Sequence, residues 1–510
     1  MRYIQGADRE QQTYWSLEDM IDEESMVRII DRYIETSDLK ELGFKGVTPA
    51  EKGRPRYEPG VMMKLLLYGY ENGIRSSRKL EKETNRNIEV KWLIGDLKPD
   101  HSSISEFRRN NIESIKKLFR SFVLLCKSWN LTGGKAIAQD GSKISASNSH
   151  KNNVKKKNID NRIKRIDERI EAYLESMDKM EQAELEAEKD KKENLPPKAL
   201  MKLLTQKEKL EAGKKIMEET ETEEISLTDP DARMMGSPGK GFDIAHNMQM
   251  AVDSKHHIVL DCDVINNPTD RGEMTPMVER LIADGHIEPN GETAYLADKG
   301  YYSGEVLAEL EKLNINTIVP RQNPPHPKDQ PKMFWCNNFT YNKETDTYTC
   351  PAGNTLYPTP TKNKETQRHS YRNIDACKNC PHNQICISGK TQQYRIIKRS
   401  EHADVCDRAD ERYEQNKPLY NLRRSLAEHP FGTIKRHMNG GYFLLRTLPK
   451  VRAEAALFYL SYNLKRASNV LGFKEIMARL DARLTHFFNF SLNMSRFNLN
   501  SQNYLISLAG

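Results

Sequence analysis

The sequence predicts a mixed α/β protein, and three observations support this fold class. Short runs rich in β-branched residues, such as 135–146 and 293–298, alternate with helical patterns in the middle of the chain. Helical spacing also fills the first 130 residues and returns at 404–428 and 450–468. The 510 residues allow roughly three domains at about 150 residues each.

The composition excludes a disordered chain and a membrane protein. Hydrophobic residues make up 37% of the chain, and no stretch approaches the roughly 18 uncharged apolar residues of a membrane span. The first residues contain no apolar run typical of a secretory signal, so we expect a cytoplasmic protein with no membrane partner. The net charge of +7 suits a polyanionic partner, although many unrelated proteins share such a charge.

Residues 1–130 predict a helical domain made of short helices with tight turns. Such helices suit a helix-turn-helix reader of DNA, in which basic side chains contact phosphates. The alternative is a packing or dimerisation domain whose basic faces are only solvated. The candidate phosphate contacts are Arg75, Arg78, Lys79, Lys82 and Arg86, or Arg108 and Arg109.

Residues 150–226 predict a charged helical hairpin. An apolar seam begins at Ile159 and repeats every three or four residues up to Met177. Pro196 and Pro197 must end this helix, and a second seam begins at Leu200. We expect the charges to form a solvated surface, with a role in dimerisation or DNA contact as the alternative.

Five of the eight cysteines lie between Cys336 and Cys386, and such crowding in a cytosolic chain indicates metal binding. A tetrahedral zinc site would stabilise a small insertion over 334–390 that has little core of its own. Reduced free thiols on a loop-rich segment are the alternative. The predicted zinc ligands are Cys350, Cys377, Cys380 and Cys386, with Cys336 or His382 as substitutes.

Three carboxylates stand out by their context. Asp140 and Asp298 each lie at or near the end of a predicted strand, where α/β folds expose ligand sites, and Glu428 lies in a late helix. Arg424 and Lys435 lie four residues before and seven residues after Glu428, on one helix face. Oxygen ligands of this kind suit Mg²⁺. Turn-forming aspartates and an exposed ion-pair network are the alternatives, and Pro430 is expected to interrupt the helix.

The order of these motifs resembles that of bacterial insertion-sequence transposases of the DDE type, in the group with a Tyr-x2-Arg-x3-Glu-x6-Lys pattern. Arg424, Glu428 and Lys435 match this pattern, whereas Asn421 stands at the tyrosine position and Tyr420 comes one residue early. QDGSKISAS and LADKGYYS resemble the first- and second-aspartate motifs. Further similar stretches are RPRYEPGVMMKLLLYGYENGIRSSRKLE, PDHSSISEFRR, NMQMAVDSKHHIVLDCDVINNPTDRGEM and LPKVRAEAALFYLSYNLKR.

The resemblance implies a ribonuclease H-like catalytic core over 131–468. This core would be interrupted by the charged hairpin at 150–226 and by the Cys-rich insertion at 334–390. Residues 1–130 would form the DNA-binding domain, and residues 469–510 a C-terminal tail.

The resemblance also implies an activity, namely cleavage of DNA and transfer of its 3′ ends to target DNA by two-metal phosphoryl transfer. Asp140, Asp298 and Glu428 would hold two Mg²⁺ or Mn²⁺ ions, while Arg424 and Lys435 would contact DNA. The expected partners are the terminal inverted repeats of the element and target DNA, bound by a homodimer or larger assembly at the bacterial nucleoid. The alternatives are a catalytically silent, transposase-derived DNA-binding protein and a helical adaptor that acts through the charged hairpin.

Overall fold

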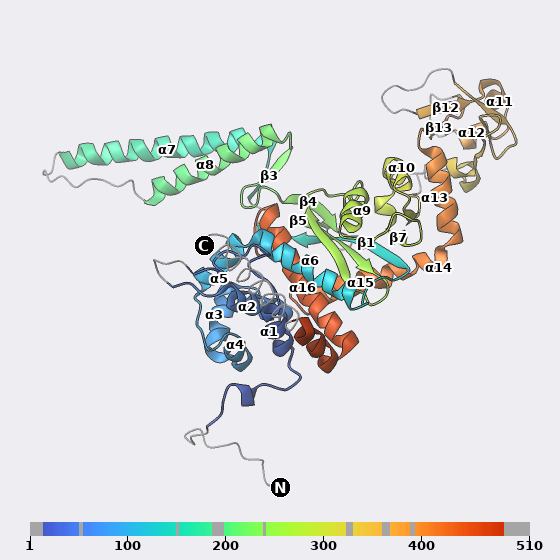
Figure 1. Ribbon diagram of the computed structural model, residues 1–510. Coiled ribbons are helices and arrows are strands. Elements are labelled where there is room, and N and C mark those ends of the chain that lie inside the picture. The colour runs from blue at the N-terminus through green and yellow to red at the C-terminus, as the bar shows by residue number, and fades with distance from the viewer. Residues whose placement is uncertain are drawn as a thin grey trace, which may run out of the picture. The chain divides into compact units, whose positions relative to one another are not determined.

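The computed structural model describes residues 14–49, 55–148, 152–185, 198–237, 241–322, 330–359, 368–387 and 393–483. The chain is mixed α/β, as predicted (Figure 1). It divides into two compact units. The first unit comprises Met1–Gly133, Gly141–Pro268 and Leu426–Gly510, and the second comprises Gly134–Asp140 and Thr269–Ser425.

The N-terminal part of the first unit is helical. Its fifth helix, α5, begins one residue after Asp100, whose carboxylate accepts a hydrogen bond from the Ser103 backbone N–H at 2.8 Å. Asp100 is therefore the N-cap of this helix. The elements are η1 (Glu18–Met20), α1 (Met26–Glu35), α2 (Pro59–Glu71), α3 (Ser77–Arg86), α4 (Ile88–Leu93), α5 (His101–Asn110) and α6 (Ile112–Ser128).

The core of the first unit forms around α16 (Leu448–Leu471), a helix with apolar residues on all sides. α16 contacts α2, α6 and strand β6 (Val259–Ile265) (Figure 1). The Asn463 side chain accepts from the Val259 N–H at 2.9 Å and donates to the Val259 carbonyl at 2.8 Å, which pairs the helix with the strand. Within the described ranges, no helix combines the length and the apolar character that crossing a membrane requires.

The strands of the first unit form an antiparallel group. β5 (Gly241–Asp253) pairs with β4 (Arg233–Ser237) and with β6, and the turn between β5 and β6 follows Asp253. β1 (Ala136–Ser145) enters this unit at Gly141 and lies beside β5.

In the second unit, the first residues of β1 pair in parallel with β7 (Ala294–Leu296), which pairs in parallel with β8 (Asn316–Ile318). α10 (Gly304–Lys312) connects β7 to β8, as parallel neighbours require. α9 (Met274–Ala283) precedes β7. β1 thus has β5 as its neighbour on one side and the parallel strand β7 on the other.

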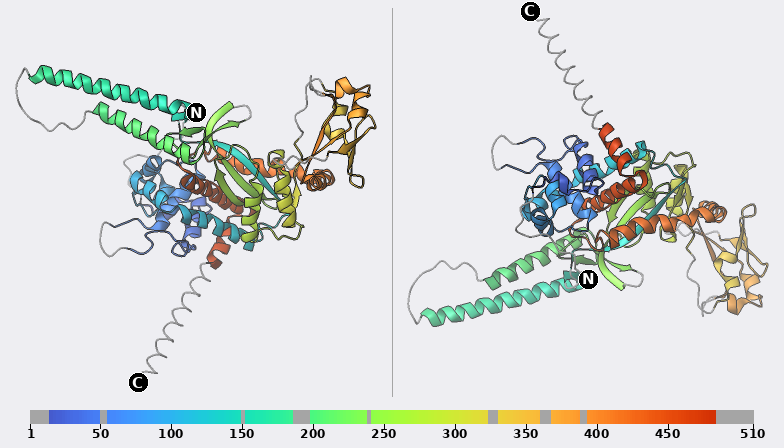
Figure 2. Two further views of the ribbon diagram at one scale, coloured as in Figure 1. Left: turned by 90° about the horizontal axis from the view of Figure 1, so that it is seen from above. Right: turned by 90° about the horizontal axis from the view of Figure 1, so that it is seen from below.

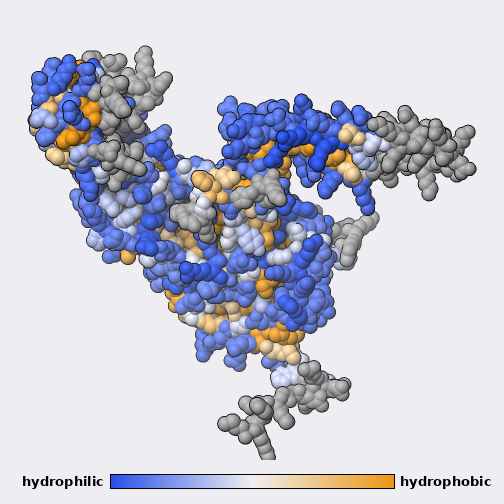
Figure 3. All heavy atoms as spheres, turned by 180° about the vertical axis from the view of Figure 1, so that it is seen from behind, coloured by the Kyte–Doolittle hydropathy of each residue, from blue (hydrophilic) through white to orange (hydrophobic). Residues whose placement is uncertain are grey.

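Two long helices of the first unit, α7 (Lys156–Leu185) and α8 (Lys198–Glu219), run side by side (Figure 2). Ile159, Ile166 and Leu210 lie in the apolar seam between them, and the short strands β2 (Asn153–Lys155) and β3 (Glu224–Ser226) pair at their base. The outer faces are hydrophilic (Figure 3). Pro196 and Pro197, the predicted turn, lie outside the described residues.

The Cys-rich segment of the second unit forms a small antiparallel sheet. Phe339, Tyr348, Leu356, Tyr371 and Ile397 form its compact core. The strands, in the order β13-β12-β11-β10-β9, are β9 (Thr340–Asn342), β10 (Thr347–Thr349), β11 (Thr355–Pro358), β12 (Arg368–Arg372) and β13 (Ile397–Ser400). The short helical elements are η4 (Lys332–Phe334), η5 (Cys336–Asn338), α11 (Ile374–Lys378) and α12 (Asn383–Cys386).

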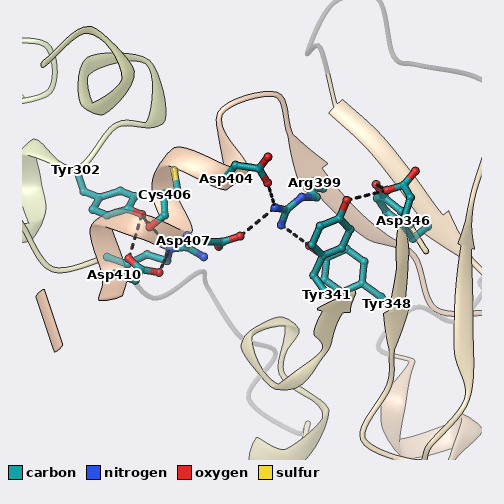
Figure 4. Close-up of polar contacts among 11 residues, drawn as sticks. Tyr302, Tyr341, Asp346, Tyr348, Arg399, Asp404, Cys406, Asp407 and Asp410 are labelled. Carbon is teal, nitrogen blue, oxygen red and sulfur yellow. Dashed lines mark hydrogen bonds and ion pairs between the residues drawn. The ribbon is translucent and has the colours of Figure 1, made fainter. Parts of the chain in front are cut away.

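Arg399 contacts both this sheet and helix α13 (Ala403–Gln415) (Figure 4). Its guanidinium lies 3.7 Å from the centre of the Tyr341 ring, and it donates to the Tyr348 hydroxyl at 3.2 Å. It also pairs with Asp404 and, at 2.9 Å, with Asp407 of α13. One residue thus joins an aromatic face on the sheet to two carboxylates on the helix.

The same helix is attached to the β7–β8 region through Tyr302 (Figure 4). The Tyr302 hydroxyl donates to Asp410 of α13 at 3.1 Å, and Arg321 pairs with Asp410 at 2.8 Å. α13 leads through α14 (Lys417–Tyr420) into α15 (Leu422–Arg436).

Candidate active site

Asp140 and Asp298 lie at equivalent positions on neighbouring parallel strands. Ala138 of β1 is paired with Leu296 of β7, and each aspartate comes two residues later. Because side chains alternate along a strand, Asp140 shares a face of β1 with Ala138, and Asp298 lies just beyond the end of β7. Asp298 also accepts from the Gly300 N–H at 2.6 Å, which fixes the turn after β7.

A buried pair on the opposite face holds β1 and β7 together just before this point. The Tyr295 hydroxyl donates to Oε1 of Gln139 at 2.7 Å, and both side chains are fully buried. This contact therefore connects β1 to β7 one residue before Asp140 and three residues before Asp298.

Asp270 is a third carboxylate near this pair, and we did not predict it from the sequence. A Cβ atom at Gly300 would lie 2.8 Å from Oδ1 of Asp298 and 3.6 Å from Oδ2 of Asp270. The two carboxylates therefore border the same small space. Asp270 lies in a loop before α9, where no periodic pattern distinguishes it, although it belongs to the stretch that resembles the family.

Tyr301 lies close to the three carboxylates described above, those of Asp140, Asp270 and Asp298. Its side chain is 1% exposed. Burial raises the pKa of the Tyr301 hydroxyl well above its usual range, and the negative charges of Asp270, Asp140 and Asp298 raise it further. Tyr301 thus stays neutral and places a hydroxyl group, not a phenolate, among these acids.

Arg423, at the start of α15, forms an ion pair with Asp140. Its Nη1 lies 3.5 Å from Oδ2 of Asp140, and its guanidinium lies 5.9 Å from the centre of the Tyr420 ring. The early tyrosine of the motif therefore contacts Arg423. Sequence reasoning missed this residue because the motif spacing pointed to its neighbour, Arg424.

The carboxylates suit a hard divalent cation such as Mg²⁺ or Mn²⁺, because these ions prefer oxygen ligands. Asp140 and Asp298 provide such oxygens, each two residues after the paired residues Ala138 and Leu296. Among the residues that the structure describes, no group of three or more His, Cys, Asp or Glu side chains is already arranged around a metal position.

Glu428 is exposed on α15, and this helix runs without interruption from Leu422 to Arg436. The expected break at Pro430 is therefore wrong. The proline lacks only the N–H that would bond to the Leu426 carbonyl, and the helix continues on both sides.

Arg424, which is exposed, and Lys435 thus share a helix face with Glu428. Lys435 also donates to the Ser142 hydroxyl of β1.

Arg75 does not have the predicted role of a phosphate contact. Its side chain is 1% exposed and forms an ion pair of 3.0 Å with Glu454 of α16, which is fully buried. Its guanidinium also lies over the rings of Tyr442 and Phe458. The charge of Arg75 is thus balanced inside the protein by Glu454, and this pair connects Arg75 to α16.

Arg78 and Lys79 are exposed on α3, and within the described residues neither has an ion pair. Of the other candidates, Lys82, Arg86 and Arg109 are exposed, Arg86 is paired with Glu83, and Arg108 is buried.

The four predicted zinc ligands line one cavity of about 30 Å³ between the small sheet and its helices. Burial raises the pKa of the Cys386 thiol to about 11. The N–H of Asn354 donates to Sγ of Cys350 at 3.3 Å. Cys336 lies apart from the four, because it is exposed and its Sγ accepts from Arg395 at 3.0 Å. These four ligands are Cys350, Cys377, Cys380 and Cys386.

Comparison with protein families gives two matches. Residues 15–110 match a transposase domain (DUF772), and residues 349–468 match a transposase DDE domain. No curated protein matches the chain. The second match includes Glu428, whereas Asp140 and Asp298 lie outside both.

The two domains imply the general properties of the chain. A transposase DDE domain implies a ribonuclease H-like core and metal-dependent cleavage and transfer of DNA, and the transposase family implies DNA as the substrate. The first match covers the helical region that carries α3, and the second covers α15 and α16. The two matches in one chain support an insertion-sequence transposase of the DDE type.

Proposed function

We propose that this chain binds the terminal inverted repeats of its own element, cleaves phosphodiester bonds there and transfers the 3′ ends to target DNA. The observation that supports the proposal is that Asp140 and Asp298 each come two residues after a paired position, Ala138 of β1 and Leu296 of β7. In a transposase of the DDE type, such a pair is where the chemistry of strand cleavage belongs.

Asp140, Asp298 and Glu428 are the proposed ligands of two Mg²⁺ or Mn²⁺ ions. When bound, the ions supply charge neutralisation at the attacking and leaving oxygens of the phosphodiester. Asp270 borders the same space as Asp298, so it is a further proposed contributor of negative charge. Tyr301 stays neutral beside these carboxylates, so it adds no charge of its own.

The chain's cations are proposed to orient the DNA. Arg424 and Lys435 flank Glu428 on the same helix face, so they are placed to contact phosphates on either side of the scissile bond. Arg78 and Lys79 of α3 are exposed and are the proposed contacts for the DNA ends. Two ends must be held together for transfer, which favours a homodimer or larger assembly on DNA in the bacterial cytoplasm.

We also propose that Cys350, Cys377, Cys380 and Cys386 hold a structural zinc ion. The observation in support is that all four line one cavity. The raised pKa of Cys386 applies to the thiol without a metal ion. Zinc binding would require the four thiols to lose their protons. Four protein ligands would leave no open position, so this ion would stabilise the small sheet and take no part in cleavage.

The function is tested by incubating the purified protein with labelled DNA that carries the element ends and Mg²⁺. Asp140→Asn, Asp298→Asn and Glu428→Gln should each lower cleavage at least about a hundredfold while DNA binding stays near that of the wild type. Glu305→Gln, which removes an exposed carboxylate of the second unit, is the matched control and should cleave normally. A wild-type protein that binds the ends but never cleaves them would instead support a catalytically silent DNA-binding protein.

A further inference from the structure

Helices α15 and α16 of the first unit border a cavity of about 280 Å³ that none of the roles above uses. Its lining is rich in cationic and hydrogen-bonding side chains, and Glu71 is the one carboxylate among the described residues that line it. The principal polar members are Glu71, His429, His437, Lys465, Arg466 and Asn469.

The charges of this cavity do not cancel. Glu71 pairs with Lys465 at 2.7 Å, so these two residues balance each other. Arg466 donates from Nε to the His256 carbonyl at 2.7 Å, which fixes its guanidinium. Within the described chain, the two terminal nitrogens of Arg466 have no hydrogen-bond partner. The cavity therefore keeps a net positive charge with two free donors on one rigid group.

Other donors beside Arg466 are also available. The side chains of His437 and Asn469 make no hydrogen bond to any residue that the structure describes, and both line the cavity. A guanidinium with neighbouring imidazole and amide groups is the donor set that recognises phosphate oxygens.

The wall of the cavity is fixed by a short hydrogen-bonded chain. The Tyr462 hydroxyl donates its hydrogen to the His257 carbonyl at 3.0 Å. The same hydroxyl lies 2.8 Å from Nδ1 of His429, so it must accept there, and Nδ1 of His429 carries the hydrogen. The cavity is thus preorganised before any ligand binds.

The cavity lies beside the proposed catalytic glutamate on the same helix. His429 directly follows Glu428, and Thr433 and His437 continue the face of His429 at intervals of four residues. A DNA strand carries a phosphate for about every 3.4 Å of duplex axis, so a strand held at Glu428 has other phosphates within one turn of this helix.

We propose that this cavity binds a phosphate group, with Arg466 as its principal contact and His437 as a second contact. The phosphate group that we favour is a backbone phosphate of the DNA strand next to the cleavage position. This choice of phosphate rests on the proposed function. A free phosphate compound has the same chemistry and is distinguished by experiment.

The test compares Arg466→Gln and His437→Gln with the wild type. Arg479→Gln is the control, since Arg479 belongs to the same unit, lies outside the cavity and pairs with Glu475. Binding of a fluorescein-labelled DNA duplex is followed by anisotropy over a series of salt concentrations. Arg466→Gln should weaken binding about tenfold and reduce the slope of log K against log salt by about 0.9. His437→Gln removes a ring without hydrogen bonds to the described residues, so it should fold normally and weaken binding by a smaller factor.

A calorimetric titration with inorganic pyrophosphate forms the second arm. Loss of pyrophosphate binding in Arg466→Gln, with unchanged DNA binding, would assign the cavity to a free phosphate compound. If both variants bind DNA and pyrophosphate as the wild type does, the proposal is overturned. A wild-type protein that binds no DNA would contradict the proposed function, and the pyrophosphate arm would still test the cavity.

Discussion

The pairing of Asp140 with Arg423 links two residues of the candidate site by charge alone. The two side chains are 25% and 18% exposed, so the attraction over 3.5 Å is only partly screened by water. A guanidinium in this position competes with a divalent cation for the same carboxylate.

Arg423→Gln should therefore tighten the binding of Mn²⁺ to the DNA-free protein by about threefold to tenfold, because a competing positive charge is removed. Isothermal titration calorimetry measures this affinity. Arg408→Gln, which removes an exposed arginine paired with Glu311 in the same unit, should leave the affinity unchanged. Weaker Mn²⁺ binding by Arg423→Gln would instead mean that the arginine positions Asp140 for the metal.

Asp229 is a second residue whose charge matters, here for stability. Burial disfavours its charged form, but hydrogen bonds from His246 at 2.9 Å and from the Thr447 N–H at 3.0 Å outweigh burial and lower the pKa of Asp229. A carboxylate whose pKa is lowered by folding stabilises the protein above its unfolded pKa of about 4, and this stability is lost as the pH falls through the folded pKa.

Asp229→Asn should lower the free energy of unfolding by about 3 kcal/mol at pH 7, since it breaks a buried pair that also holds the start of α16. Urea unfolding at several pH values measures the effect. Because the substitution removes the titrating group, the gap between variant and wild type should shrink below about pH 4. A gap that stays constant with pH would show that the charge of Asp229 contributes nothing.

At the scale of elements, local patterns predict well and distant contacts do not. The apolar seam that begins at Ile159 was predicted from residue spacing along one helix, because such spacing is a local pattern. The prediction that Arg75 contacts phosphates was wrong because its partner, Glu454, lies 379 positions away in the sequence. No local pattern indicates this pairing.

The Arg75–Glu454 pair connects the α2–α3 region to α16. Glu454→Gln should lower the free energy of unfolding by about 3 kcal/mol, because it leaves the Arg75 charge buried and unmatched. Chemical denaturation of the intact protein provides the value. Glu475→Gln, at an exposed ion pair of the same unit, should change it by less than about 1 kcal/mol. If Glu454→Gln proved equally mild, the guanidinium would have to be neutralised by other groups.

At the scale of the whole molecule, the fold class and the family were predictable because several weak motifs occur in one order along the chain. The α/β class is confirmed, and both transposase domains match. The surroundings of the site were less predictable. Asp270 and Arg423 reach it through loops and helix starts whose positions depend on tertiary packing.

DNA binding by the intact chain should depend strongly on salt, because exposed cations displace counterions from the phosphates. Replacing both Arg78 and Lys79 by glutamine should reduce the slope of log K against log salt by about 1.8. Anisotropy with a labelled duplex gives this slope, and Lys116→Gln, at a half-buried lysine paired with Glu113, is the control. An unchanged slope in the double variant would remove α3 from the DNA interface.

The most direct test of the central claim is a change of metal specificity. Asp140→Cys, Asp298→Cys and Glu428→Cys each replace a hard oxygen ligand by a thiolate, which accepts Mn²⁺ better than Mg²⁺. Cleavage of labelled element ends by each variant is measured with either ion. We expect all three variants to be inactive with Mg²⁺ and to recover part of their activity with Mn²⁺. Cleavage at the wild-type rate with Mg²⁺ by any of them would contradict the assignment of that residue as a metal ligand.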